Sequence, residues 1–249
     1  MLKKVVLAFG FIHVVSVTAQ SPNGSTFDPR IGTSSIVRED IFAGYLAHDH
    51  ERQLRGEKNV EILLAERPKD RARLTAWKAW IVLNRAVDAY ESKRMSEFER
   101  DYQRSLDLFS EAANIQPDDA GVLAITGSGF VTFSDRLPER VRRDAWNLAY
   151  KTYTKLWRVQ EADFDNLALH SRGELLAGLA QAAQRSAHPS ESAQMLEKII
   201  TTMSGTTYAV MAKKWVDSPE AAAKTNLTCR TCHEAGRFES RKASLEQLK

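Results

Sequence analysis

The chain has 249 residues and a formal net charge of +3, and 43% of its residues are hydrophobic while 27% are charged. These proportions are ordinary for a soluble globular protein, and this length can bury a sizeable core in one or two domains. The sequence carries no basic stripe interleaved with aromatic residues, so we expect no binding to nucleic acid.

Residues 1–19 have the pattern of a secretory signal peptide. Two lysines precede an apolar run over residues 5–17, and small residues lead up to Ala19. An uncleaved membrane anchor is the alternative, but the apolar run is short for a membrane span and contains His13. We therefore predict cleavage after Ala19 and a mature protein that is periplasmic or secreted, with no stable membrane span.

Residues 20–38 are rich in Ser, Pro, Gly and Asn, and we expect them to form a flexible lead-in. Helical periodicity then dominates residues 39–217, where strand signals are scarce. Apolar residues recur at three- and four-residue steps over residues 74–90 and 102–112, with a break near residues 92–95. The predicted fold class is therefore all-α.

Prolines mark the expected helix junctions of this body. A proline suits the first turn of a helix, where its missing N–H leaves no hydrogen bond unmade. The junction prolines are Pro68, Pro117, Pro138, Pro189 and Pro219.

Two of these junctions share a spacing pattern. The stretches "VEILLAERP" (60–68) and "FSEAANIQP" (109–117) each begin with an apolar residue, carry another three positions later, and end in proline. A leucine follows each proline after six positions. This spacing resembles the tetratricopeptide repeat, a helical hairpin of which several stack into an α-solenoid. In that family one repeat would close with Phe109, Ala112 and Pro117, and the next would open with Leu123, Gly127 and Phe130.

The match to the tetratricopeptide pattern is incomplete. Lys78 stands where a small residue is expected, and Pro68 and Pro117 are 49 residues apart, more than one regular repeat. A third unit, from about Asn166, has helix–turn–helix character without the closing proline. We predict a degenerate tetratricopeptide-like α-solenoid over residues 39–217, and an unrelated all-helical bundle is the alternative.

We assign the tryptophans of the helical residues 39–217, and two of their glycines, to packing. We expect the tryptophans to fill the core or the helix contacts, and the two glycines of "GSGF" (127–130) to allow close helix packing. Motifs for a serine hydrolase, a zinc protease or a phosphate-binding loop do not occur in the sequence, so we do not expect an enzyme. The tryptophans are Trp77, Trp80, Trp146, Trp157 and Trp215.

Both cysteines of the chain lie in "CRTCH" (229–233), a Cys-x-x-Cys-His motif. Two thiols at this spacing can add to the two vinyl groups of haem, and the adjacent histidine can bind the iron. A redox dithiol needs a thiolate of lowered pKa, typically on a βαβ scaffold, which the sequence does not indicate. A structural zinc site requires four ligands, and a disulfide at this spacing would close a very small, strained loop.

The motif resembles the haem-attachment site of c-type cytochromes. That resemblance implies one covalent haem c, with Cys229 and Cys232 as the thioether sites and His233 as the axial iron ligand. Attachment of this type occurs on the outer side of the membrane, in agreement with the signal peptide. Residues 218–249 would then form the haem-attachment segment and a capping helix. We expect Trp215 and Phe238, with the final repeat, to supply apolar surface for the haem, and Leu245 and Leu248 to face inward from the capping helix.

The sixth iron ligand is not evident from the sequence, because no Met or His follows His233. The ligand would come from upstream, from a partner protein, or be absent. Met211 and His170 are the preferred upstream candidates. The remaining candidates are His48, His50, His188, Met95, Met195 and Met203, which have better explanations as solvated or core residues.

Two functions from different classes follow. The first is an exported monohaem cytochrome that transfers electrons to or from a periplasmic redox protein docked on the helical array. The alternative is a periplasmic interaction or assembly scaffold without a redox role, in which the motif is structural or unoccupied. A gas or redox sensor is a third, weaker hypothesis, and it requires an iron with an open or exchangeable position.

Overall fold

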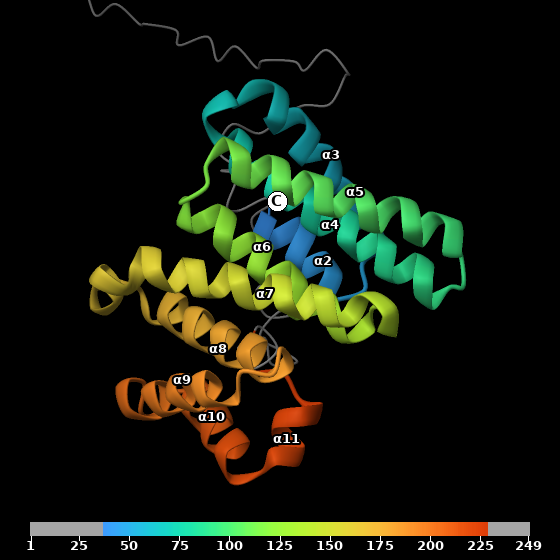
Figure 1. The fold of residues 1–249 in the computed structure, drawn as a ribbon. Coiled ribbons are helices and arrows are strands. Elements are labelled where there is room, and N and C mark those ends of the chain that lie inside the picture. Colours follow the sequence, from blue (N-terminus) through green and yellow to red (C-terminus); the bar gives the residue numbers. More distant parts are fainter. Residues whose placement is uncertain (1–36, 229–249) are drawn as a thin grey trace, which may run out of the picture. The chain divides into compact units, whose positions relative to one another are not determined.

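A computed structural model describes residues 37–228, and every regular element in that range is helical (Figure 1). The predicted all-α class is therefore confirmed. No helix in the described range combines the length and apolar character that a membrane crossing requires. In chain order the elements are η1 (Val37–Phe42), α2 (Ala43–Leu46), α3 (His50–Glu66), η2 (Pro68–Asp70), α4 (Arg71–Glu91), α5 (Met95–Ile115), α6 (Ala120–Phe133), η3 (Ser134–Arg136), α7 (Glu139–Gln160), η4 (Glu161–Asn166), α8 (Leu169–Arg185), α9 (Pro189–Thr202), α10 (Thr207–Asp217) and α11 (Pro219–Lys224).

Helix boundaries follow the proline and capping signals of the sequence. Pro68, Pro189 and Pro219 lie in the first turn of η2, α9 and α11. Side-chain oxygens cap other starts: the Asp119 carboxylate accepts from the N–H of Val122 at 2.8 Å at the start of α6. Such caps satisfy N–H groups that have no partner within the helix. The expected break after α4 is present, since this helix ends at Glu91 and α5 begins at Met95.

Neighbouring helices pack in pairs. The closest packing joins α4 to α5, α6 to α7, and α8 to α9, and each pair is connected by a short turn (Figure 1). The pairs also contact one another, because α6 packs against both α4 and α7 while α7 and α8 are in contact. After the third pair, α10 packs on α9. This succession of contacts between adjacent helices is solenoid-like, and the unit expected from about residue 166 is the α8–α9 pair.

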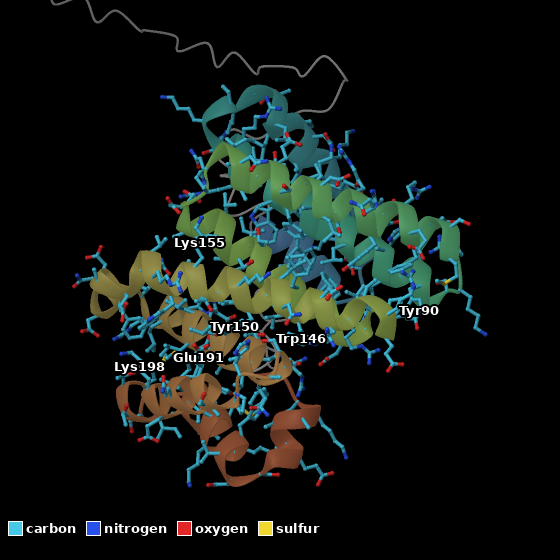
Figure 2. The ribbon with its side chains drawn as sticks, viewed as in Figure 1. Tyr90, Trp146, Tyr150, Lys155, Glu191 and Lys198 are labelled. Carbon is cyan, nitrogen blue, oxygen red and sulfur yellow. The ribbon has the colours of Figure 1, made fainter. Side chains whose placement is uncertain are left out.

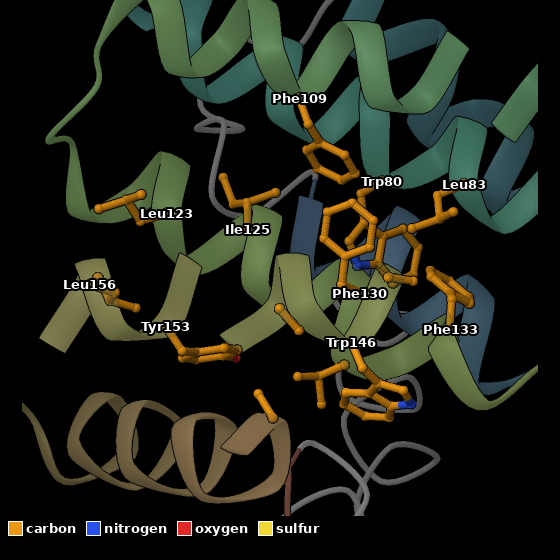
Figure 3. Packing of buried hydrophobic residues seen from close by; sticks show 14 of the residues in the cluster. Trp80, Leu83, Phe109, Leu123, Ile125, Phe130, Phe133, Trp146, Tyr153 and Leu156 are labelled. Carbon is orange, nitrogen blue, oxygen red and sulfur yellow. The ribbon is translucent and has the colours of Figure 1, made fainter. Parts of the chain in front are cut away.

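Trp80 of α4 lies at the centre of the aromatic core and is only 1% exposed. Its ring centroid is 4.8 Å from that of Phe133, which lies beside it in Figure 3. The ring centroid of Tyr45 is 5.4 Å away. Trp146 and Trp215 are also buried, whereas Trp77 and Trp157 are partly buried and packed against the core. The prediction that the tryptophans fill the core and the helix contacts is confirmed.

Tyr153 of α7 interlocks the second and third pairs (Figure 3). A Cβ atom at Gly127 of α6 would lie 2.7 Å from Tyr153 Cε2, and one at Gly178 of α8 would lie 2.1 Å from Tyr153 Cζ. At Gly129 a Cβ atom would lie 3.0 Å from Trp80 Cδ1. Glycine is required here because the ring occupies the space that a side chain would need. The packing role expected for the "GSGF" glycines is therefore confirmed.

Polar contacts tie α9 to the preceding pair (Figure 2). The Tyr150 hydroxyl of α7 donates to the Glu191 carboxylate, and its ring stacks on His188 at 4.1 Å. The Lys198 ammonium lies 5.2 Å from the ring centroid of Trp157, a cation–π contact. These contacts lie on the outer side of the apolar core and help to orient the third pair.

Candidate functional site

The Cys-x-x-Cys-His motif lies outside the described residues. Cys229, Cys232 and His233 are therefore not placed by the structure, and neither are the signal peptide nor the residues expected to form the capping helix, including Phe238, Leu245 and Leu248. The described chain ends at Thr228, the residue immediately before Cys229. The structure thus shows how the chain is held up to the first residue of the motif.

Two short helices lead to this point. The sequence predicts a last repeat helix that ends near Trp215 and a short helix that begins at Pro219, and both are present as α10 and α11. The Ser218 hydroxyl caps α11 by accepting from the N–H of Ala221 at 3.2 Å. After α11, residues 225–227 make polar contacts with α8 and α10, and Thr225 also bonds back to Ala221 of α11.

Gln181 of α8 is the main contact of these residues. Its side-chain carbonyl accepts from the backbone N–H of Leu227 at 2.7 Å, and its side-chain NH2 donates to Asn226 Oδ1 at 2.8 Å. Gln181 is completely buried, and Leu227 and Thr228 are 1% and 4% exposed. A buried amide that uses both ends of its side chain in this way holds the chain in one register.

Arg185 lies one turn further along α8 and holds the end of α11. Its Nη1 donates to the backbone carbonyl of Ala222 at 2.7 Å, and its Nη2 donates to that of Thr225 at 3.4 Å. The guanidinium lies between the rings of Trp146 and Trp215, 6.0 Å and 5.9 Å from their centroids. Arg185 therefore satisfies carbonyls that have no partner within the helix, and it links α7, α8 and α10.

The two indoles around Arg185 are also hydrogen-bonded. Trp215 Nε1 donates to Thr225 Oγ1 at 2.8 Å, and Trp146 Nε1 donates to Asp135 Oδ1 at 3.0 Å. Asp135 Oδ2 lies 3.6 Å from Arg185 Nε, which completes the charge balance of the cluster. We refer to the side chains of Gln181, Arg185 and Trp215, together with residues 225–228, as the C-terminal anchor.

The preferred axial-ligand candidates lie on the neighbouring helices. Met211 of α10 is partly buried and packs against the core. His170 is exposed at the start of α8, and its Nδ1 lies 3.3 Å from the Tyr208 hydroxyl, which also donates to Glu174 at 2.7 Å. Their role as iron ligands stays a prediction.

The other candidate histidines and methionines lie where their interpretation as solvated or core residues predicts. His48, His50 and His188 are exposed, and His188 stacks on Tyr150 as described above. Met203 is buried and Met195 is partly buried against the core, while Met95 is exposed at the start of α5. Within residues 37–228 no three His, Cys, Asp or Glu side chains gather in a way that could hold a metal ion.

Two open hollows, of about 610 Å³ and 410 Å³, lie along α3, α4 and α5 and share Arg71 and Glu111. The Arg71 guanidinium lies 3.4 Å from the Glu111 carboxylate, and in the smaller hollow Lys78 Nζ lies 2.6 Å from Glu61 Oε1. Small-molecule sites are mostly apolar and enclosed, whereas these hollows are shallow and lined by paired charges. They therefore do not form a second candidate active site.

Sequence reasoning did not identify Gln181 and Arg185. The available signal was a glutamine inside the apolar run "LLAGLAQAA" (175–183). Because every face of the helix is buried over this run, the side-chain amide of the glutamine is buried as well. Such a residue needs a polar partner, although the sequence does not say which one. No family model matches this chain, and no curated protein or solved structure matches it either.

Proposed function

We propose that this protein is an exported monohaem c-type cytochrome. One haem c would be held by thioether bonds to Cys229 and Cys232, with His233 as an axial ligand of the iron. The haem supplies one-electron exchange, and the helical array would dock the periplasmic redox protein that gives or takes the electron.

The observation that carries this proposal is the Cys-x-x-Cys-His motif, which contains both cysteines of the chain. The donor set fits covalent haem: two sulfurs at this spacing match the two vinyl groups, and an imidazole follows directly. A structural zinc site usually has four ligands, commonly in two closely spaced pairs, and the sequence has no second cysteine pair. The signal-peptide pattern of residues 1–19 supports maturation outside the cytoplasm.

The C-terminal anchor supports the same proposal from the described residues. It holds Thr225 to the buried Trp215 of α10 and Leu227 to Gln181 of α8, in the residues that directly precede the motif. A haem has a large apolar surface that must be kept from water, and the anchor holds the residues before the motif on a packed protein surface.

The solenoid-like packing of the helix pairs supports a docking role. The spacing around Pro68 and Pro117 suits tetratricopeptide-like repeats, and arrays of this kind present extended surfaces to protein partners. The three pairs α4–α5, α6–α7 and α8–α9 are the repeat units that we assign to this array.

The test is secretion of the full chain in a host that attaches haem in its periplasm. We expect a mass equal to the processed polypeptide plus one haem, and a Soret band that survives denaturation because the haem is covalent. The double variant Cys229→Ala/Cys232→Ala should lose both. Thr231→Ala, which changes a residue between the two cysteines, is the matched control and should keep the haem.

A colourless, fully secreted chain with free thiols would refute the cytochrome proposal. It would leave the alternative, a periplasmic interaction or assembly scaffold without a redox role. His233→Ala separates the two roles within the motif: the thioether bonds should still form, whereas the oxidised and reduced spectra should change because the iron loses its ligand.

Carbon monoxide tests the sixth ligand of the iron. Rapid binding to the reduced protein indicates an open or weakly held position, as a sensor requires, and slow or absent binding indicates a six-coordinate electron carrier. In the second case Met211→Leu and His170→Ala distinguish the two upstream candidates, because only loss of the true ligand should open the iron to carbon monoxide.

A further inference from the structure

We infer that Gln181 is a positioning residue, which fixes the point where the haem-attachment segment leaves the helical array. The hydrogen bonds of Gln181 stand on the described structure, whereas their effect on the haem rests on the proposed function. Gln181 lies in α8, 45 and 46 residues before its two partners, Asn226 and Leu227.

Packing alone does not explain a glutamine at position 181. Gln181 is fully buried, and the other residues of the run 175–183 in α8 are leucines, alanines and a glycine. An apolar side chain of similar volume would avoid the desolvation of the amide and would fill the same space. What an apolar residue cannot provide is direction, since a hydrogen bond fixes both the distance and the angle of its partner.

The backbone partner of Gln181 lies close to the motif in sequence. Gln181 accepts from a backbone N–H, that of Leu227, in a segment outside any helix. Two peptide units separate Leu227 from Cys229, so the reach of the chain keeps the two Cα atoms within about 7 Å of each other. Fixing the backbone at Leu227 therefore limits the positions that the chain's reach leaves open to the first cysteine of the motif.

The contacts of Arg185 and Trp215 hold the same segment and the helix directly before it. Arg185 holds Ala222 and Thr225 by their carbonyls, and Trp215 holds the Thr225 hydroxyl. A shift of residues 225–228 along α8 would break the bonds of Thr225 together with those of Gln181. The anchor is thus a set of directional contacts, and among its side chains Gln181 bonds the residue nearest to the motif in sequence.

The consequence is an effect on the haem environment. If the haem is attached as proposed, a segment held against α8 would limit its exposure to water, whereas a freed segment would increase that exposure. Greater solvent exposure favours the oxidised, more highly charged iron and so lowers the reduction potential. Gln181 should therefore influence the potential although it is not a ligand.

The experiment compares Gln181→Leu with Asn84→Leu. Asn84 is a matched control, because it is also a buried side-chain amide in the first helix of a pair, with its partner Gln53 far from the anchor in sequence. The full chain is studied without haem, as the Cys229→Ala/Cys232→Ala form, and with haem. In both forms we expect amide hydrogen exchange at Leu227 to accelerate on the order of tenfold in Gln181→Leu and to stay unchanged in Asn84→Leu.

The haem-loaded proteins provide the second readout, with a reduction potential that is lowered in Gln181→Leu but not in Asn84→Leu. If Gln181→Leu does not fold, Asn226→Ala removes one of the bonds from the other side while α8 stays intact, and it should accelerate exchange at Leu227 in the same direction. Unchanged exchange at Leu227 in the folded variant would overturn the inference.

The two proposals fail in different ways. A wild-type chain that acquires no haem refutes the cytochrome, yet Gln181-dependent exchange at Leu227 in that same chain still supports the anchor. A haem-loaded wild type, in which Gln181→Leu changes neither the exchange at Leu227 nor the potential, refutes the positioning role and leaves the cytochrome standing.

Discussion

The middle of the array and the C-terminal anchor are held together by different physical means. Between α6, α7 and α8 a single ring, Tyr153, fills the space left by Gly127 and Gly178. At the anchor, Gln181 and Arg185 hold the chain through hydrogen bonds to the backbone. Both regions involve α8, so this one helix packs by shape at one point and by directional bonds at another.

The difference shows what each means of attachment provides. Close apolar packing gives most of the stabilisation, but it does not by itself fix how a non-helical segment is aligned along a helix. Hydrogen bonds to buried polar groups contribute little net free energy, yet they specify one alignment because any other leaves a donor or acceptor unsatisfied. Substitutions in the middle should therefore lower global stability, whereas substitutions in the anchor should loosen a local segment.

The largest effect is expected for Tyr153→Ala. Tyr153 is a buried aromatic residue, and its removal leaves a cavity between the second and third helix pairs. Truncation of a buried aromatic ring typically lowers the free energy of unfolding by about 3–5 kcal/mol. Urea denaturation followed by circular dichroism measures this change, and a loss below about 1 kcal/mol would contradict the interlock.

The next largest effect is expected for Gly178→Ala. The added methyl group would overlap the Tyr153 ring, and overpacking of this kind lowers the free energy of unfolding by about 1–3 kcal/mol. In the Tyr153→Ala background the same change should be neutral or stabilising, because the space is free and alanine favours the helix. Four urea titrations give this double-mutant cycle, and simple additivity would count against the interlock.

We expect Arg185→Gln to loosen the C-terminal anchor locally and not to destabilise the whole fold as the changes at Tyr153 and Gly178 do. This change removes the guanidinium from the carbonyls of Ala222 and Thr225 and from Asp135. Unsatisfied buried groups of this kind destabilise by about 1–3 kcal/mol, and here the cost should fall on local opening. Hydrogen exchange of the α11 amides should accelerate more than that of the α6 amides. Equal acceleration in both helices would mean that the anchor is not a separate local unit.

The smallest effect is a pH dependence at the start of α6. The Arg73 guanidinium, whose Nη2 lies 2.7 Å from Asp119 Oδ2, lowers the pKa of that carboxyl below its usual value, and the N–H of Val122 acts in the same direction. A lowered pKa in the folded state contributes stability that is present above the unfolded pKa of about 4 and is lost as the pH falls through the folded pKa.

We therefore expect the free energy of unfolding to decrease below about pH 4, by about 1 kcal/mol or less from this partly exposed pair. Asp119→Asn should remove that part of the pH dependence while the amide oxygen still caps α6. Urea titrations between pH 3 and pH 6 on both proteins check it, and identical pH profiles would contradict the assignment.

Several features of the fold and of the candidate site could be predicted from the sequence because they are local. Prolines and capping residues set helix starts, as at Pro189 and Pro219, and apolar periodicity set the helices themselves. The glycines of "GSGF" indicate close helix packing, although the sequence does not show which side chain fills the space beside them. The Cys-x-x-Cys-His motif is local as well, since two thiols and one imidazole occur within five consecutive residues, and its haem chemistry stays a prediction.

Only the tertiary structure decided which residues meet across long separations. A buried glutamine in α8 indicates that a polar partner must exist, but the path of the chain after α11 determines that the partner is the N–H of Leu227. Likewise, Gly127 indicates close packing, but the arrangement of three helices determines that Tyr153 fills the space. The physical reason is the same in both cases: local pattern fixes what each residue requires, and packing of distant segments fixes what satisfies it.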